Sequence, residues 1–588
     1  MSEKQEYKHS SFRENITSTK DGSYNLLDII INRYKRYPEE KLYGYIKDDN
    51  IIWKNAREFL GEVIALSTEL SKIISKEELV GIFSINRYEW VLSQHAIYLS
   101  GGVDCPLYST FGVSAIKHVI NQTKMRLCFL TGDKAKFLLK EVLGTGEMSL
   151  KYLIFFDEIS LETKEEFNNL GIQTFILNDF IKMSLQSDLS IYLNQFSLPN
   201  INDICTVCYT SGTTGNPKGV ILSHKNFISI LAAFDRSSGE FLPVFNEDDV
   251  HLSYLPLSHI LERITQMVFL YFGGRVVFYS GNISNFIKDI QIVKPTILPG
   301  VPQIFARIQK EIKERVREKG RILQCFFNFA LNYKIKRQSK GIYDSSIFDA
   351  LFFNRIKEKF GGRIRGFFGG GSLIDEKHIK FMQAVFSCKM YVGYGSTETT
   401  GVISCTNPTD FLYDSIGTPF PCTKVKLSEV EDFPGKYEIW AKGDSVFHGY
   451  YQNDAATKEC FSDGWFMTGD LGKYENKVLK IVGRKKDIFK TSRAEYIAPE
   501  KLEQLFMIDE IEDILVTGKP NKSYIIAIVV CLKDFSDAYI INKIKERANE
   551  AYIDKEIPSY EIPSKIVVRR ESFDALGDVK TPTLKKKR

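Results

Sequence analysis

The sequence predicts an α/β protein, with a large N-terminal domain of layered α/β sheets and a small α+β domain at the C-terminal end. Two observations support this prediction. Short apolar runs rich in β-branched and aromatic residues recur along the chain and end in Gly, Pro, Asn or Asp, as strands do. Helical patterns lie between these runs, and such alternation favours layers built on mainly parallel sheet. The predicted strands lie at 80–86, 127–133, 153–158, 174–179, 250–256, 275–280, 295–300, 365–371 and 389–395.

The clearest helix is predicted over 303–320. Its apolar residues repeat every four positions, at Ile304, Ile308, Ile312 and Val316, against a surface of Lys, Glu and Arg. The basic residues of this segment alternate with acidic ones. We therefore interpret it as a solvated helix face rather than a nucleic-acid-binding stripe.

The pattern changes after Gly472, where a hairpin-like stretch leads to a charged segment and then to helix, strand, strand and helix. A small domain of about 100 residues is predicted there, within the usual range of domain sizes. We place the boundary after Arg484, which divides the chain into domains of 1–484 and 485–588.

The composition excludes two classes of protein, strong nucleic-acid binders and acidic disordered chains. The 588 residues carry a net charge of only +5, whereas strong nucleic-acid binders carry a large positive excess because they neutralise phosphates. With 44% hydrophobic and 13% aromatic residues, the chain can bury a core and is not an acidic disordered protein. The length exceeds the ~100 to 200 residues of one domain, so we expect a multidomain enzyme without a nucleic-acid partner.

The number of cysteines and the length of the apolar runs indicate where in the cell the protein resides. The ten cysteines are too sparse for a disulfide scaffold, and the beginning of the chain lacks the apolar stretch of a secretory signal. Cys205 and Cys208 form a CxxC without a second pair at zinc-finger spacing, so we interpret them as structural strand residues. No apolar run approaches the ~18 residues needed to cross a bilayer. We expect an intracellular protein that is not secreted and has no transmembrane helix.

The sharpest signal is YTSGTTGNPKGV at 209–220. Its glycines, hydroxyl side chains and lysine supply free backbone N–H groups, hydroxyl donors and a cation, which together suit a polyphosphate. It is not a Walker A loop, because Pro217 stands where the second Gly is needed and Gly219 follows Lys218 where Ser or Thr would hold magnesium. An ordinary surface turn rarely combines these features, so we predict a phosphate-binding loop.

This motif resembles the phosphate-loop signature of the adenylate-forming superfamily, which comprises acyl-CoA synthetases, luciferases and the adenylation domains of nonribosomal peptide synthesis. Further motifs similar to that superfamily run through nearly the whole chain: LPLSHILER at 255–263, GYGSTETTG at 393–401, DGWFMTGD at 463–470, GRKKDIFK at 483–490 and TPTLKKKR at 581–588. Among its branches, VGIFSINRYEW at 80–90 and AEYIAPEKLE at 494–503 look like the long-chain fatty acyl-CoA synthetases. The resemblance implies that the small C-terminal domain is a mobile lid.

The resemblance also implies a nucleotide site at the carboxyl end of a predicted strand, where ligands bind in open α/β sheets. Thr397 would donate its hydroxyl to the α-phosphate of ATP, and Glu398 would supply the anionic oxygen that Mg2+ prefers. Asp470 and Arg484 would hold the ribose hydroxyls, and Tyr394 would stack on adenine. The other implied nucleotide-binding residues are Thr210, Ser211, Gly212, Thr213, Thr214, Gly215, Lys218, Gly370, Gly371 and Gly395.

Three more positions follow from the resemblance. Lys587 matches the catalytic lysine, with Lys585 as the one-register alternative because the usual preceding Gly is missing. Lys486 stands at the hinge about which the lid would rotate. His259 corresponds to an aromatic gate between the nucleotide and the thiol tunnel, but a His beside Leu and Ile is equally often packed and hydrogen-bonded, and both interpretations stay open.

The chain departs from the long-chain synthetase pattern at several places. Phe466 and Met467 precede the Thr of the signature, Tyr474 replaces a Trp, and FFGGGSLI at 367–374 lacks the usual Ala-Pro. Ala494 occupies a position that is usually Gly in the loop near CoA, which leaves a close backbone approach there open. These changes concern substrate details more than the reaction.

The implied activity is that of an ATP-dependent long-chain fatty acid:CoA ligase acting through an acyl-adenylate. Fatty acid, ATP and CoA are the expected substrates, with Mg2+ as the cofactor. Two alternatives stay open: an adenylating enzyme that passes the acyl group to another acceptor, and a catalytically poor lipid-binding scaffold.

We expect a cytoplasmic protein, or one held peripherally on the cytosolic face of an intracellular membrane such as the endoplasmic reticulum. The sequence leaves chain-length preference, the acyl-tunnel residues and the oligomeric state open.

Overall fold

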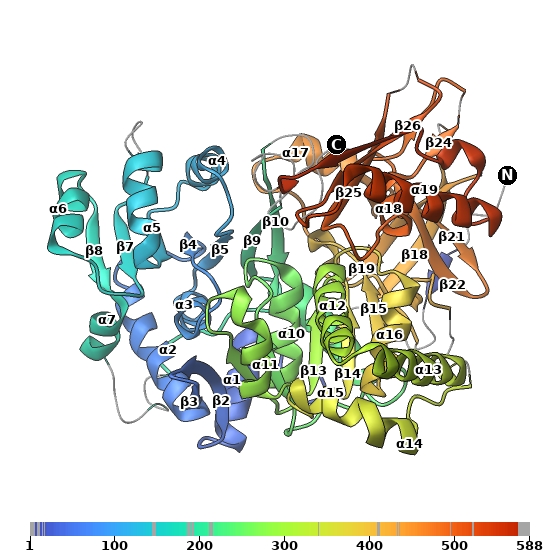
Figure 1. Ribbon diagram of the computed structural model, residues 1–588. Helices are drawn as coiled ribbons and strands as arrows, with labels where there is room; N and C mark the ends of the chain where they lie inside the picture. The colour runs from blue at the N-terminus through green and yellow to red at the C-terminus, as the bar shows by residue number, and fades with distance from the viewer. Residues whose placement is uncertain are drawn as a thin grey trace.

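The computed structural model describes most of the chain, and Figure 1 shows its path. The described residues are 6–8, 12–14, 16, 18–143, 149–184, 189, 193–210, 216–338, 340–407, 412–431, 433, 435–493, 495–519 and 522–573. Apart from the first strand β1 (Glu6–Lys8), the first third of the chain, blue to cyan, forms one side of the molecule, and the C-terminal elements, in red, lie over the other side.

The first large sheet belongs to the N-terminal part of the chain. Within the described ranges it has seven strands in the order β10-β9-β5-β4-β6-β7-β8. Neighbouring strands are parallel except for the antiparallel hairpin β9–β10. The strands are β4 (Leu79–Phe83), β5 (Val103–Leu107), β6 (Leu127–Leu130), β7 (Tyr152–Phe155), β8 (Gln173–Ile176), β9 (Ile204–Thr210) and β10 (Lys218–Ser223). The helices between them are α2 (Ala56–Leu70), α3 (Tyr88–Leu99), α4 (Val113–Thr123), α5 (Gly132–Phe137), α6 (Leu161–Asn169) and α7 (Leu177–Ser184).

Two further sheets contain more parallel strands. One has the order β11-β12-β2-β3, from Val250–Ser253, Arg275–Phe278, Lys41–Lys47 and Asn50–Asn55. The other has the order β13-β14-β15-β16-β17, from Ile297–Gly300, Gly366–Gly369, Lys389–Tyr394, Ser404–Cys405 and Thr418–Pro419. Their helices include α1 (Leu26–Arg36), α9 (His224–Ser237), α10 (Ile260–Tyr271), α11 (Phe286–Val293), α12 (Pro302–Glu318), α13 (Arg321–Gln338) and α16 (Glu376–Phe386). Parallel strands alternating with helices confirm the predicted α/β class, and α12 confirms the helix predicted over 303–320.

An antiparallel sheet follows in the chain. It has the order β1-β18-β19-β21-β20, with β22 paired to β21. These strands are Glu6–Lys8, Thr423–Glu429, Tyr437–Gly443, Trp465–Glu475, Phe461–Ser462 and Val478–Arg484. Asn476 and Lys477 join β21 to β22 with φ of 51° and 65°, the left-handed backbone that a two-residue hairpin turn requires. The hairpin expected after Gly472 is therefore present.

The last elements pack around their own apolar cluster. After β23 (Phe489–Lys490) and β24 (Tyr496–Ile497) come α18 (Pro499–Leu505), β25 (Asp513–Gly518), β26 (Ile525–Val530), α19 (Asp537–Ile553) and β27 (Lys565–Arg569). Buried side chains from Ile497 to Ile566 form a cluster separate from those of the preceding sheets. The order helix, strand, strand, helix confirms the prediction. β27, which pairs parallel with β26, was not predicted.

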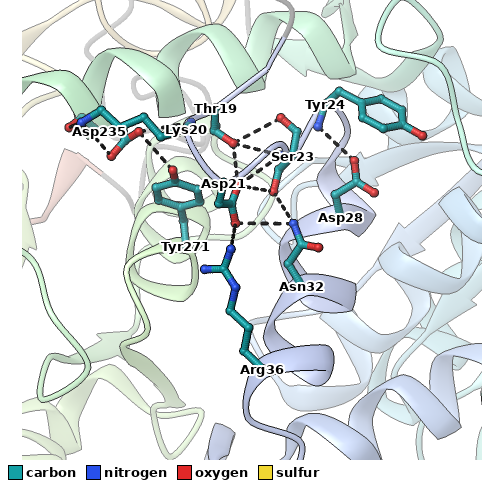
Figure 2. Close-up of polar contacts among 10 residues, drawn as sticks. All are labelled: Thr19, Lys20, Asp21, Ser23, Tyr24, Asp28, Asn32, Arg36, Asp235 and Tyr271. Carbon is teal, nitrogen blue, oxygen red and sulfur yellow. Dashed lines mark hydrogen bonds and ion pairs between the residues drawn. The ribbon is translucent and has the colours of Figure 1, made fainter.

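A cluster of hydrogen bonds connects the N-terminal segment around residues 19–24 to helices α1, α9 and α10 (Figure 2). Asp21 accepts hydrogen bonds from Thr19 Oγ1 at 2.7 Å and from the Ser23 hydroxyl at 2.7 Å. Although burial would raise it, these bonds lower the pKa of Asp21. Asp235 on α9 accepts from the hydroxyl of Tyr271 on α10 at 3.1 Å. Asn32 on α1 donates to Ser23 Oγ at 3.0 Å, and Lys20 Nζ lies 3.5 Å from Asp235, so the segment links α1, α9 and α10.

A buried ion pair holds α10 against the first sheet. Arg263 Nη2 lies 2.9 Å from Asp104 Oδ1, and both side chains are almost fully buried. Arg263 also donates to Thr206 Oγ1 at 2.8 Å and to the Tyr98 hydroxyl at 2.7 Å. Thr206 and Tyr98 in turn donate to Asp104. Each charge therefore has the hydrogen-bond partners that burial demands.

We expect Arg263→Met to lower the free energy of unfolding by about 3–5 kcal/mol, because it leaves Asp104 buried without its counter-charge. Urea denaturation followed by circular dichroism measures the change. Arg315→Met is the control, since Arg315 pairs at 2.6 Å with Glu311 on a partly exposed helix surface, where a pair contributes about 0.5 kcal/mol or less. An equally small loss for Arg263→Met would contradict the role assigned to the pair.

Candidate active site

A cavity of about 590 Å3 brings together residues from motifs that lie far apart in the sequence. Its wall includes Gly369 at the carboxyl end of β14, and Gly393 and Gly395 around the end of β15. Ligands bind at such strand ends in open α/β folds. Of the residues predicted from the sequence, the cavity is lined by Thr210, Lys218, His259, Gly370, Gly371, Gly395, Thr397, Glu398, Arg484 and Lys486.

The β9–β10 hairpin brings the two ends of the predicted phosphate loop together. Thr210 and Lys218 are cross-strand partners and both line the cavity. The Lys218 ammonium lies 5.0 Å from the centroid of the Tyr450 ring, a favourable contact for a cation. Ser211, Gly212, Thr213, Thr214 and Gly215 lie outside the described residues.

Thr397 and Glu398 stand in a short helical turn, η5 (Thr397–Thr399), directly after β15. Ser396 precedes this turn, and its backbone N–H donates to Thr399 Oγ1 at 3.0 Å. A Cβ on Gly395 would come within 2.6 Å of the Gly401 carbonyl oxygen, so only glycine permits this close approach. The turn therefore presents Thr397 and Glu398 to the cavity in a fixed geometry.

Glu398 has a partner that sequence reasoning missed. The Tyr450 hydroxyl donates to Glu398 Oε1 at 2.9 Å, and burial together with Glu398 raises the pKa of Tyr450. The phenol thus stays protonated and orients the carboxylate. The Phe447 backbone N–H donates to the Glu398 carbonyl at 2.8 Å and ties this segment to η5.

The donor set around Glu398 fits a magnesium ion that arrives with a polyphosphate. Among the residues that the structure describes, no group of three or more His, Cys, Asp or Glu side chains could hold a metal. Mg2+ is commonly bound by one or two carboxylates, water and substrate phosphates. A single oriented carboxylate beside the Thr397 hydroxyl satisfies that pattern.

Asp470 and Arg484 form a pair across the β21–β22 hairpin. They are cross-strand partners, and Arg484 Nε lies 3.1 Å from Asp470 Oδ1. The Asp470 carboxylate raises the pKa of Arg484 above its usual value. Tyr394 donates its hydroxyl to Asp470 Oδ2 at 2.8 Å and is itself buried. These contacts place Tyr394 beside the pair, and its stacking on adenine stays a prediction.

His259 is both hydrogen-bonded within the fold and exposed to the cavity, so it fits both interpretations that the sequence left open. It is the N-cap of α10, where its Nδ1 accepts from the Leu261 backbone N–H at 3.2 Å. Its half-buried side chain also lines the cavity. A role as a gate therefore stays a prediction, now with a position that permits it.

Aromatic side chains make an apolar wall on the α9 and α10 side of the cavity. Phe234 lies 5.1 Å from Phe420, Phe245 lies 5.8 Å from Phe269 and 6.1 Å from Phe368, measured between ring centroids. All five rings line the cavity, as do Ile260, Ile264 and Val268 of α10. The four-residue spacing of the aliphatic residues along α10 could have indicated this side of the cavity from the sequence. The phenylalanines come from separate elements, and no sequence pattern relates them.

Three positions predicted from the sequence, Lys587, Lys585 and Ala494, lie outside the described residues. Lys486 and Asp487 line the cavity just after β22, where the domain boundary was predicted.

Comparisons with known proteins agree with these motifs. The sequence profile of the family described as "AMP-binding enzyme" matches residues 33–451. Long chain acyl-CoA synthetase 5 of Arabidopsis thaliana is 30% identical over 98% of this chain and 92% of its own length. Long-chain-fatty-acid--CoA ligase 5 of Mus musculus is 34% identical over 87% of this chain and 78% of its own.

Solved structures share the fold. The adenylation domain of a carboxylate reductase from Mycobacterium chelonae has a TM-score of 0.80 at 20% identity, covering 96% of this chain and 88% of that one. O-succinylbenzoate coenzyme A synthetase of Bacillus subtilis, in complex with ATP and magnesium, has a TM-score of 0.66 at 19% identity, covering 95% and 98%. At this identity the likeness shows the fold alone, and it confirms the predicted fold class.

We expect Tyr450→Phe to weaken the binding of magnesium–ATP about tenfold, because a hydrogen bond to a charged group contributes about 1.5–3 kcal/mol and its loss frees the Glu398 carboxylate. Calorimetric titration with a non-hydrolysable ATP analogue, with and without Mg2+, measures the effect. Tyr451→Phe is the matched control, since that hydroxyl contacts only the Gln452 amide, at 3.4 Å, among the contacts of the described residues. Equal affinities for the two variants would show that the Tyr450 hydroxyl does not position Glu398.

Proposed function

This chain belongs to the AMP-binding enzyme family, and from that membership we propose that it converts long-chain fatty acids to acyl-CoA. A carboxylate oxygen of the fatty acid attacks the α-phosphorus of ATP, and pyrophosphate leaves. The CoA thiol, losing its proton, then attacks the carbonyl carbon of the acyl-adenylate, and AMP leaves. The products are acyl-CoA, AMP and pyrophosphate.

One observation carries this proposal: the same cavity has a charged end and an apolar, aromatic wall. Lys218, Thr397 and Glu398 line the first, and groups of these kinds bind a polyphosphate and its metal. Five phenylalanines and the aliphatic side of α10 line the second, which suits a hydrocarbon chain. The relatives named long-chain acyl-CoA synthetases support this choice of acid.

The chemistry requires alignment and charge neutralisation rather than a protein nucleophile. Bound Mg2+ would offset phosphate charge, and Glu398, oriented by Tyr450, would hold it. Thr397 would donate to the α-phosphate. Asp470, whose carboxylate already accepts from Tyr394 and Arg484, has lone pairs left for ribose hydroxyls. The predicted phosphate loop would bind the β- and γ-phosphates.

We further propose the division into a large domain of 1–484 and a lid of 485–588. The separate apolar cluster between Ile497 and Ile566 supports it. Polar contacts from the lid to the large domain include Gln504 Nε2 to the Leu373 carbonyl at 2.7 Å and Lys313 to Asp509 at 3.3 Å. Such contacts are compatible with a lid that rotates about Lys486 between the two half-reactions.

A cytoplasmic or peripheral, cytosolic-face location is part of the proposal, since the substrate partitions into bilayers. In the described part of the chain, no helix is long and apolar enough to span a membrane.

The test is a coupled assay for AMP formation, run with and without CoA over fatty acids of several chain lengths. We expect AMP release to depend on CoA and to be fastest with long chains. Glu398→Ala is the inactive control, because it removes the protein ligand of the metal and should nearly abolish ATP–pyrophosphate exchange. AMP formation that needs no CoA would instead favour transfer to another acceptor, and no AMP with any acid would favour a scaffold.

A second prediction concerns Lys587. Its ammonium is suited to bridge the attacking carboxylate and the α-phosphate, and it would leave with the lid before CoA enters. We expect Lys587→Ala to reduce adenylation roughly a hundredfold or more, by analogy with the loss of a transition-state charge contact. The variant should still convert synthetic acyl-AMP and CoA to thioester. Normal adenylation by Lys587→Ala, together with its loss in Lys585→Ala, would move the assignment to Lys585.

A further inference from the structure

Helix α13 has an inner face that is buried and an apolar outer face that the described residues leave exposed. The inner face is buried at Phe327, Ala330, Lys334 and Gln338. The outer face carries Ile322, Phe326, Phe329 and Tyr333, which are 77%, 59%, 64% and 43% exposed. Their spacing of i, i+4, i+7 and i+11 puts them on one side of a helix. Large exposed apolar side chains in one row mark an interaction surface.

The next elements extend this row. In α14 (Ser346–Phe348) the ring of Phe348 lies 6.0 Å from that of Phe329 and 5.2 Å from that of Tyr333. Ile347 beside it and Leu351 in the π-helical turn η4 (Asp349–Phe353) are exposed. We call the six exposed residues the α13 face: Ile322, Phe326, Phe329, Tyr333, Ile347 and Leu351. Figure 1 shows α13 and α14 at the lower right edge of the molecule.

A buried ion pair fixes α13 against the neighbouring elements. Lys334 Nζ, on the inner side of α13, lies 2.5 Å from Asp349 Oδ1 and 2.6 Å from Ser387 Oγ. Asp349 also accepts from the Ser345 backbone N–H at 2.8 Å. These bonds connect α13, η4 and the end of α16. The elements that carry the exposed side chains are therefore fixed relative to one another before any partner arrives, which lowers the entropic cost of binding.

Basic residues flank the face at both ends. Between 315 and 340 the sequence has eight basic residues and one acidic residue. Arg317 and Lys319 at the end of α12 and Arg321 at the start of α13 are exposed, and Lys336 and Lys340 are exposed at the C-terminal end of α13. A second copy of this chain docked face to face would set these positive charges against one another. A surface of negative charge attracts them instead.

We propose that the α13 face docks on a bilayer surface that contains anionic lipids. The apolar side chains enter the boundary between headgroups and acyl chains, and the lysines and arginines at both ends contact the headgroups, as in interfacial amphipathic helices. This inference rests on the peripheral location proposed above and adds the docking surface and the lipid charge, but it does not depend on the formation of acyl-CoA. Vesicle binding by a chain that forms no acyl-CoA would refute the function and leave the docking intact.

Vesicle flotation with the full chain tests the proposal. We expect the protein to float with vesicles of phosphatidylcholine and phosphatidylserine at a 3:1 ratio, with a partition coefficient at least tenfold higher than for phosphatidylcholine alone. Raising the salt from 0.05 to 0.5 M should lower this partition, since it screens the basic residues. Equal partition into both kinds of vesicle, or none, would overturn the proposal.

The double variant Phe326→Ser/Phe329→Ser should reduce partition at least tenfold. The matched control is Leu161→Ser/Leu170→Ser, which removes two exposed leucines at α6 among Glu162, Glu165 and Glu166 and should change partition less than twofold. Both variants should unfold at the wild-type temperature and form thioester from a soluble medium-chain acid at the wild-type rate. Wild-type partition by the Phe variant, or an equal loss in the control, would overturn the assignment to α13.

A label on the native thiol gives a direct readout. Cys325 on α13 is the exposed cysteine of this chain, whereas Cys460 is half-buried and the other eight are buried. An environment-sensitive fluorophore on Cys325 should shift to the blue on adding anionic vesicles. A wild-type dimer in the absence of lipid that the Phe variant converts to a monomer, without a lipid-induced shift, would assign the face to self-association instead.

Discussion

The ion pair between Arg263 and Asp104 joins α10, which lines the cavity, to β5 of the first sheet. Asp104 lies beside β9, whose last residue, Thr210, lines the cavity and belongs to the predicted phosphate loop. Arg263 lies in the first turn of α10, one turn after His259. Removing two charges from water is costly, and it is tolerated here because Thr206 and Tyr98 complete the hydrogen bonds of both partners. The position of α10 relative to β5 and β9 is thereby set.

A second buried network positions α10 from another side. Glu262 Oε1 lies 2.7 Å from His251 Nε2, and Gln266 donates to Ser253 Oγ at 2.9 Å. Asn86 also donates to Ser253 Oγ, at 2.9 Å, and accepts from the Leu257 backbone N–H at 2.8 Å. The charged residues of LPLSHILER therefore hold the helix, while Ile260, Ile264 and Val268 face the cavity. The charged residues of the motif thus have structural partners, and Ile260 begins the apolar side of α10 that lines the cavity.

The sequence predicted those parts of the fold and site that depend on local pattern. Alternating strands and helices, α12, and the hairpin at Asn476 and Lys477 all follow from residues near one another in the chain. The convergence of Thr397, Glu398 and Arg484 on one cavity follows from the strand ends that carry them. Cys205 and Cys208 are buried in β9, as their strand context predicted.

The remaining features depend on long-range packing that one sequence does not reveal. The aromatic wall combines rings from α9, α10, β14 and two loops, and no spacing relates Phe234 to Phe420. Tyr450 lies 52 residues after Glu398 in the chain, and the hydrogen bond from the Phe447 backbone N–H to the Glu398 carbonyl helps to bring the two side chains together. The outer side of α13 has the same helical spacing as a core face, so only the structure distinguishes it as exposed.

The hydrogen bonds around Arg484 support a hinge at Lys486 rather than at Arg484 itself. Arg484 is held by its cross-strand register and ion pair with Asp470, and the Lys485 backbone N–H donates to the Gly469 carbonyl at 2.8 Å. Rotation at Lys486 leaves these contacts intact. It disturbs the bonds from Asp487 and Ile488 to the Arg484 carbonyl, each of which contributes only about 0.5–1.5 kcal/mol. The rotation of the lid that we propose would therefore leave the Asp470–Arg484 pair in place, as two half-reactions on one bound adenylate would require.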